Sequence, residues 1–170
     1  GTISNAGNTT ADDLSLSGTY SANLSITAGP TTSLPSTTWF ILSGNTRPML
    51  MMEYSTTIKN AHQLQLMNAN LNANYTLGAD IDMNAGMTNA ADVWGTNRDT
   101  GTGKGFVPIA TTINGYSGIF DGANHTISNL YINRPSSFSV ALIAWLKQGT
   151  VKNIGLMNPA ITGGGQIAGR

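Results

Sequence analysis

A short apolar pattern that recurs near the C-terminal end of the chain constrains its fold more than any other feature. Residues 126–132 (TISNLYI) match residues 150–156 (TVKNIGL) at an offset of 24 positions. Threonine, asparagine and aliphatic side chains recur at Thr126, Ile127, Asn129, Leu130 and Ile132, and again at Thr150, Val151, Asn153, Ile154 and Leu156. A period in the low twenties with short strands is typical of a parallel β-helix, in which each coil is one repeat. We therefore expect Asn129 and Asn153 to stack in neighbouring coils, as amides do in hydrogen-bonded ladders.

Short alternating segments elsewhere fit a second fold, the antiparallel β-sandwich. Apolar and polar residues alternate at 14–16, 24–26, 38–42 and 75–83, with glycine and proline turns between them. A sandwich gives no reason for threonine and asparagine to recur in phase. The sequence therefore favours an all-β fold of the parallel β-helix type.

One segment breaks the strand pattern and predicts a short helix near residues 60–71. Asn60 is a good N-cap, and Gln63 stands where its side chain can reach back to the cap. The apolar positions that follow at helical spacing are Ala61, Leu64, Met67 and Leu71. Residues 84–105, rich in Asn, Gly, Asp and Thr, predict a loop held by Trp94. The methionines Met49, Met51 and Met52 are interpreted as core residues.

Composition limits the classes of function open to the chain. Its 170 residues fit one domain, and eight basic side chains balance eight acidic ones, so the formal net charge is zero. A nucleic-acid binder needs a basic excess, which argues against such a partner. The longest apolar run, residues 140–146, is too short to span a bilayer, so we expect no membrane insertion. Cysteine is absent, which excludes disulfides and thiolate metal sites.

The N-terminal part differs in composition from the rest. Residues 1–37 form a Ser/Thr/Gly-rich stretch with short strands, interpreted as the end of a preceding repeat. Residues 38–170 are interpreted as the β-helix segment. The chain begins at Gly1 without a methionine, which we take to indicate a processed product or a segment of a longer protein.

Residues 116–132 (YSGIFDGANHTISNLYI) contain the pattern G-x-F-D-G-x-x-H-T-I-x-N-L. Its defining positions are Gly118, Phe120, Asp121, Gly122 and His125. This pattern resembles that of bacterial surface adhesins with GLUG motifs, of the filamentous-haemagglutinin-like type exported by two-partner secretion. Segments 39–50, 58–71, 75–82 and 105–109 are also similar, so the resemblance covers about residues 38–168.

The resemblance implies a right-handed parallel β-helix, an extracellular or cell-surface location, and a non-catalytic role as a structural or adhesive segment of a large secreted protein. It also implies an outer-membrane secretion partner for the parent protein. The expected binding partners are a glycan or protein receptor on a host or environmental surface, or copies of the chain itself. No catalytic, cofactor-binding or metal-binding residue is carried over from the family.

The alternative function is a carbohydrate-active β-helix enzyme, either a polysaccharide lyase or a hydrolase. Asp80 and Asp82 flank one residue on a strand, so both carboxylates point to the same face. Together with Asp121 and His125 they are the residues to suspect in such an enzyme. Neither His62 nor His125 has other ligands at the spacing of a zinc site, and we expect no metal and no cofactor. A binder of ice or crystal surfaces is a third hypothesis, disfavoured because regular Thr-x-Thr ladders are missing.

Overall fold

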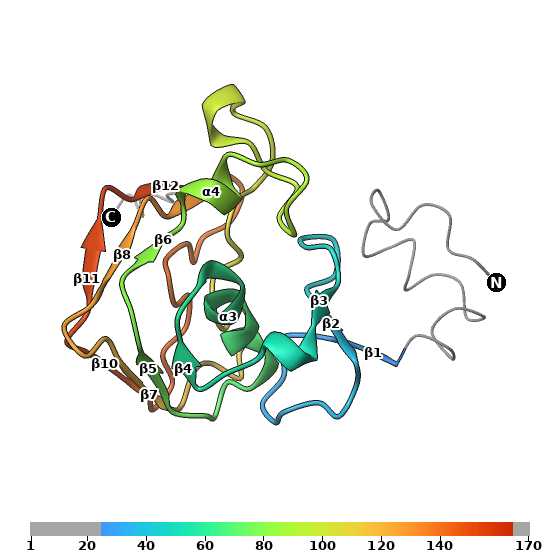
Figure 1. Ribbon diagram of the computed structural model, residues 1–170, viewed down its shortest axis with the longest axis vertical. Helices are drawn as coiled ribbons and strands as arrows, with labels where there is room; N and C mark the ends of the chain where they lie inside the picture. Colours follow the sequence, from blue (N-terminus) through green and yellow to red (C-terminus); the bar gives the residue numbers. More distant parts are fainter. Residues whose placement is uncertain (1–24, 165–170) are drawn as a thin grey trace, which may run out of the picture.

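The computed structural model describes residues 25–164, which Figure 1 shows as short strands and a few helical turns. The strands within this range are β1 (Ile26–Ala28), β2 (Trp39–Ile41), β3 (Met49–Leu50), β4 (Thr57–Ile58), β5 (Tyr75–Leu77), β6 (Ile81–Asp82), β7 (Ile119–Asp121), β8 (Thr126–Ser128), β9 (Tyr131–Arg134), β10 (Thr150–Lys152), β11 (Gly155–Met157) and β12 (Ala160–Gly163). The helical segments are η1 (Met51–Glu53), α3 (Ala61–Gln65), η2 (Leu66–Ala69), α4 (Asn84–Met87) and η3 (Arg98–Thr100). Strands dominate and helices are short, which confirms the all-β class.

Two successive passages of the chain lie one on the other. Strands β7, β8 and β9 belong to the inner layer, residues 109–134, and β10, β11 and β12 belong to the outer layer, residues 142–163. Each outer strand pairs in parallel with one inner strand: β10 with β7, β11 with β8, and β12 with β9. Parallel bridges at Ile109–Ile143 and Tyr116–Leu146 continue the pairing between the layers.

The register of these pairs corrects the expected repeat of 24 residues. Ile119 pairs with Thr150 and Thr126 pairs with Gly155, which are offsets of 31 and 29 residues. The similarity in the sequence therefore relates β8 to β10, two different strands of neighbouring layers. Both strands begin with threonine and place an aliphatic second residue, Ile127 or Val151, opposite an apolar residue of the neighbouring layer.

The expected stacking of Asn129 on Asn153 is also wrong. The backbone N–H of Asn124 donates to the carbonyl of Asn153 over 2.9 Å, and that of Asn129 donates to the carbonyl of Met157 over 3.0 Å. Asn153 therefore lies beside Asn124, and Asn129 lies beside the turn that contains Asn158. All four asparagines have positive φ, between 47° and 65°, which asparagine tolerates better than most residues.

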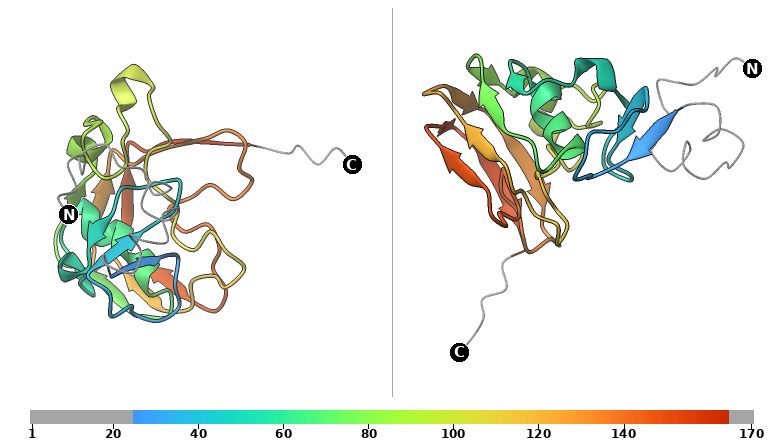
Figure 2. Two further views of the ribbon diagram at one scale, coloured as in Figure 1. Left: turned by 90° about the vertical axis from the view of Figure 1, so that its right-hand side faces the viewer. Right: turned by 90° about the horizontal axis from the view of Figure 1, so that it is seen from below.

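Earlier strands extend the same sheets in the same direction. The two larger sheets have the strand orders β10-β7-β5-β4 and β11-β8-β6, and every pair in them is parallel. The parallel direction contradicts the antiparallel sandwich for this part of the chain. Among the paired strands of residues 25–164, β2 and β3 run antiparallel, at the end of the molecule where β1 also lies. Figure 2 shows the outer layer (red) at the opposite end from β1 and β2 (blue).

The predicted helix is present as α3 followed directly by η2. The side chain of Asn60 accepts from the N–H of Gln63 over 2.9 Å, as expected of an N-cap. The Gln63 side chain reaches one residue further back than expected and accepts from the N–H of Lys59 over 2.7 Å. Leu64, Met67 and Leu71 are fully buried, so this stripe fills the space between the sheets.

Residues 84–105 were expected as one loop, and they contain α4 and η3 as well. Each is about one turn long, too short to show helical periodicity in the sequence. Asn97 caps η3 by accepting from the N–H groups of Asp99 and Thr100. Trp94 holds the segment as expected: its side chain is 5% exposed and its Nε1–H donates to Oε1 of Gln65 over 2.7 Å.

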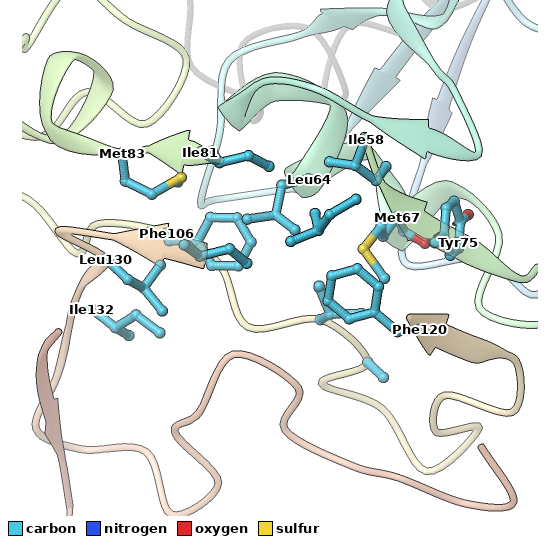
Figure 3. Close-up of a cluster of buried hydrophobic side chains, with 14 of the residues drawn as sticks. Ile58, Leu64, Met67, Tyr75, Ile81, Met83, Phe106, Phe120, Leu130 and Ile132 are labelled. Atoms are coloured by element: carbon cyan, nitrogen blue, oxygen red, sulfur yellow. Dashed lines mark hydrogen bonds between the residues drawn. The ribbon is translucent and has the colours of Figure 1, made fainter. Parts of the chain in front are cut away.

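The core consists of two adjacent clusters of buried side chains. The larger one joins α3, the sheets and the inner layer, and Figure 3 shows Leu64 and Met67 pointing from the helical segment toward Phe106 and Phe120. The smaller one contains Phe40, Leu42, Met49, Leu66, Ala69 and Val107. Of the methionines expected in the core, Met49 is buried and Met51 packs against the smaller cluster, whereas Met52 is 85% exposed.

The N-terminal expectations are met only where the structure describes them. The strand expected at residues 38–42 is present as β2. The strand expected at 24–26 shares only Ile26 with β1, Ser25 precedes that strand with a positive φ, and Leu24 lies outside the described residues. The strand expected at residues 14–16 lies outside the described residues. A domain boundary between residues 37 and 38 stays a prediction. No helix in the described part is long and apolar enough to cross a membrane.

Candidate functional site

Within the described residues, the outer layer presents the unpaired edges of three strands, with a half-exposed apolar side chain on each of them. Val151 lies opposite Phe120, Leu156 opposite Ile127, and Ile161 opposite Ile132 in the strand pairs. The three inner residues are fully buried, whereas their outer partners are 39%, 40% and 38% exposed. Within residues 25–164 no strand pairs with the outer side of β10, β11 or β12. Val151, Leu156 and Ile161 thus stand in register with core residues, but no described residue covers them as they cover the inner layer.

Two further apolar side chains belong to the same layer. The carbonyl of Trp145 accepts from the N–H of Tyr116 over 2.8 Å, which fixes this segment against the inner layer. Trp145 is 47% exposed and Leu146 is 48% exposed. Exposed apolar side chains are therefore found both on the strands of the outer layer and beside its bridge at Leu146. Exposed apolar groups that form a continuous surface commonly mark an interaction site.

Two Asp–Asn contacts, which we call the corner pairs, tie neighbouring layers together. Nδ2 of Asn129 donates to Oδ1 of Asp82 over 2.8 Å, and Nδ2 of Asn153 donates to Oδ1 of Asp121 over 3.0 Å. Each carboxylate also accepts from the N–H two residues ahead of it, that of Asn84 or Ala123, over 2.9 Å. Each aspartate thus accepts one hydrogen bond within its own turn and a second one from an asparagine side chain of the neighbouring layer.

The hydrogen bonds at the corner pairs favour ionised carboxylates. The amide of Asn129, followed by the N–H of Asn84, lowers the pKa of Asp82. The N–H of Ala123, followed by the Asn153 amide and Lys152, lowers the pKa of Asp121. Because protonation removes an acceptor charge, the stabilisation is complete above the unfolded pKa of about 3.9 and is lost as the pH falls through the lower folded values.

We expect the free energy of unfolding in urea to fall when the pH is lowered from 6 to 3. Replacing both Asp82 and Asp121 with alanine should lower stability at pH 6 and flatten its dependence on pH. The matched control is Asp99→Ala, which removes an exposed carboxylate outside the corner pairs and should leave the slope intact. An unchanged slope in the double variant would contradict the assigned role of the corner pairs.

The residues of the family-like pattern lie in the inner layer and support the stack. Phe120 points into the core, and Asp121 belongs to a corner pair. Gly118 and Gly122 stand where a side chain would overlap backbone atoms, at Ala73 and at Asn153 respectively. The side chain of His125 is partly exposed to solvent, and its Nδ1 is 3.2 Å from Oδ1 of Asp80. The five residues of the pattern thus make separate structural contacts and do not meet in one reactive centre.

The four residues suspected in a carbohydrate-active enzyme do not converge on one cavity. Asp80 and Asp82 both point outward, as the alternation predicted. Asp80 accepts from the N–H of Thr126 over 2.8 Å besides contacting His125, and these two contacts, in that order, lower the pKa of Asp80. Asp82 and Asp121 are engaged in separate corner pairs. In the described range no group of three or more His, Asp or Glu residues is arranged to hold a metal ion.

His62 has two acidic partners that sequence reasoning missed. Its Nδ1 is 3.0 Å from Oε2 of Glu53, and its Nε2 is 2.7 Å from Oδ1 of Asp92. These acids lie 9 and 30 residues away along the chain, so no spacing rule relates them to His62. All three are partly exposed, and the ring of His62 lies 5.5 Å from that of Trp94.

An open cleft of about 320 Å³ adjoins this histidine. Its charged and imidazole side chains are Lys59, His62, Asp80, Asp82 and Asp92, contributed by the start of α3, by β6 and by the loop after α4. Its wall combines one amine with three carboxylates. The acids of this cleft already accept hydrogen bonds from protein groups.

Comparison with known proteins finds similarity to one very large protein. Over 100 residues, 56% of this chain, the sequence is 36% identical to Halomucin from Haloquadratum walsbyi (strain DSM 16790 / HBSQ001). The matched region is 1% of Halomucin, so the chain spans only a minute fraction of that relative. No protein-family model matches the chain. No solved structure matches it either.

Proposed function

We propose that the chain is a non-catalytic structural or adhesive segment of a large secreted surface protein. In this proposal its parallel layers are coils of a right-handed β-solenoid, and further coils continue the stack beyond the outer layer. The single observation that carries the proposal is the exposure of Val151, Leu156 and Ile161, one on each outer strand. Each is in register with a fully buried residue of the inner layer and is nevertheless about 40% exposed.

Both the apolar surface and the strand edges of the outer layer favour a further coil. In a solenoid each repeat contacts only its neighbours, so a terminal coil exposes the groups that the next coil would cover. An uncovered strand edge leaves a row of N–H and C=O groups available for pairing. A further coil would satisfy these groups and bury the three aliphatic side chains in one step. The low charge of the outer layer, whose charged side chains are Lys147 and Lys152, suits such coverage.

Two similarities support a location outside the cell. Halomucin similarity over half of the chain supports a secreted or cell-surface protein. The resemblance of residues 116–132 to GLUG-motif adhesins implies the same location. The proposal therefore includes export by two-partner secretion with an outer-membrane partner. The partner of such a segment would be a surface glycan or protein, or another copy of the same solenoid. A solenoid suits this role because it repeats weak contacts along its length.

Duplication of the outer layer tests whether it accepts a further coil. Gly163 pairs with Arg134, so a copy of residues 135–163 inserted after Gly163 continues the chain in register. We expect the insert to bury Val151, Leu156 and Ile161 and to raise the free energy of unfolding by about 2 kcal/mol. The measurement is urea denaturation followed by circular dichroism, with one cooperative transition expected.

The control for this experiment keeps the insert and removes its apolar contact. In the control, Val151, Leu156 and Ile161 of the original outer layer are replaced with serine, which should abolish the gain in stability. An insert that stays unfolded on the otherwise native chain would refute the solenoid. Labelling of intact producing cells with antibodies against the chain tests the location separately, and labelling only after lysis would refute a surface protein.

A further inference from the structure

His62 joins three segments that are distant in the sequence. It stands in the first turn of α3, between Glu53 of η1 and Asp92 of the loop formed by residues 89–95. Both ring nitrogens face carboxylate oxygens at hydrogen-bond distance, 3.0 Å and 2.7 Å. Oδ1 of Asp92 also accepts from the N–H of Val93, so this oxygen is fixed in the loop.

The number of protons on the ring decides whether both contacts are hydrogen bonds. A neutral imidazole carries one N–H, and its other nitrogen is an acceptor. An ionised carboxylate only accepts, so a neutral ring would place a lone pair against one of the two acids. Only the imidazolium donates to Glu53 and Asp92 together. We propose that His62 is a pH-operated clip, which holds the 89–95 loop against α3 and η1 when protonated and loosens it when neutral.

The other contacts of the loop define how far it would open. The guanidinium of Arg47 donates to the carbonyls of Ala90 and Asp92, and the N–H of Arg47 donates to the carbonyl of Val93 over 2.7 Å. Trp94 stays bonded to Gln65 inside the core. Loss of the clip therefore releases the Asp92 side chain and loosens the loop, while the Arg47 and Trp94 contacts keep it from unfolding. Because Asp92 and His62 both line the cleft, the change widens the cleft at its rim.

The surroundings of His62 are on balance acidic. Burial is the strongest single influence and opposes the charged ring, but the hydrogen bond and charge of Asp92, and then those of Glu53, outweigh it and raise the pKa of His62 above 6.5. The other charged groups around the clip are Arg47 behind the loop, and Lys59, Asp80 and Asp82 across the cleft. The clip is thus complete below the ordinary histidine pKa and is lost as the pH rises through the higher folded value.

This inference is independent of the proposed function, since it concerns contacts among η1, α3 and the 89–95 loop and uses no residue of the outer layer. Its test uses the full chain and nuclear magnetic resonance. The titration of the His62 ring is followed together with amide hydrogen exchange of residues 89–95 between pH 5.5 and 8.5, corrected for intrinsic exchange. We expect protection of these amides to fall as His62 loses its proton, by about tenfold for each unit by which its pKa is raised.

Two variants and one control make the result specific. His62→Gln should give a loop with low protection at every pH, and Asp92→Asn should lower the pKa of His62 and weaken the dependence on pH. His125→Gln, which changes the histidine beside Asp80, should leave the amide protection of the 89–95 loop and its pH dependence unchanged. Titration of His62 without a change in loop protection overturns the proposal, and this wild-type observation decides the matter even if His62→Gln does not fold. Retention of the wild-type pH dependence in His62→Gln overturns it equally.

Discussion

Replacing Phe120 with alanine is expected to lower the free energy of unfolding by about 3–5 kcal/mol, the usual cost of truncating a buried phenylalanine. Phe120 is fully buried, and it pairs with Tyr75 on one side and with Val151 on the other. The cavity would therefore lie where β5, β7 and β10 meet, between the helical segment and the outer layer. Urea denaturation monitored by circular dichroism measures the loss.

The neighbouring residue supplies a control for this prediction. Ile119 is in the same strand, but its side chain points outward and is 43% exposed. Ile119→Ala changes the intrinsic strand preference and removes little buried surface, so it should cost less than about 1 kcal/mol. Equal losses in the two variants would mean that β7 does not separate an inner from an outer face, and the register of the stack would then be wrong.

Features set by neighbouring residues were predictable from the sequence. The cap at Asn60 follows from local hydrogen-bonding rules, and the structure confirms it. The alternation over residues 75–83 predicted that Leu77, Ala79, Ile81 and Met83 share a face; Leu77, Ile81 and Met83 are buried, and Ala79 is half-buried. The same rule placed Asp80 and Asp82 outward. The cap is predictable because it depends on geometry within one helical turn. The segment 75–83 is instead divided into β5 and β6, which belong to different sheets, although its alternation of buried and exposed residues continues across the bend.

Features set by long-range contacts were not predictable in the same way. A similarity of seven residues does not reveal which strand of the next layer it relates to, so the offset of 24 residues was assigned to the wrong pair. The 29- and 31-residue offsets depend on turn lengths that are fixed only when the layers stack. The two acids at His62 are brought together by the packing of η1, α3 and the 89–95 loop. The corner pairs had a partial signal, because each aspartate is the last residue of its strand and each asparagine comes directly after its strand.

Gly122 links the inner layer to the outer layer through its lack of a side chain. A Cβ atom there would overlap the carbonyl oxygen of Asn153 and lie 2.5 Å from the Cα of Ile154. Both are backbone atoms, so rotation of a side chain cannot relieve the overlap. The N–H of Gly122 also donates to the carbonyl of Lys152 over 2.8 Å, which holds the turn close to the outer layer.

Gly122→Ala should therefore push the turn between β10 and β11 away from the inner layer, at a cost of about 1–3 kcal/mol, the range for added atoms in a packed region. The matched control is Gly155→Ala, where the new Cβ would meet the methyl group of Thr126 at 2.9 Å, a contact that a small side-chain movement relieves.

Amide exchange separates this prediction from general destabilisation. Protection should fall first in β10 and β11 of the Gly122→Ala variant, while β4 and β5 keep theirs. A uniform loss of protection would show instead that the outer layer unfolds only together with the rest of the molecule, and a variant as stable as wild type would show that the layers do not approach each other at Gly122.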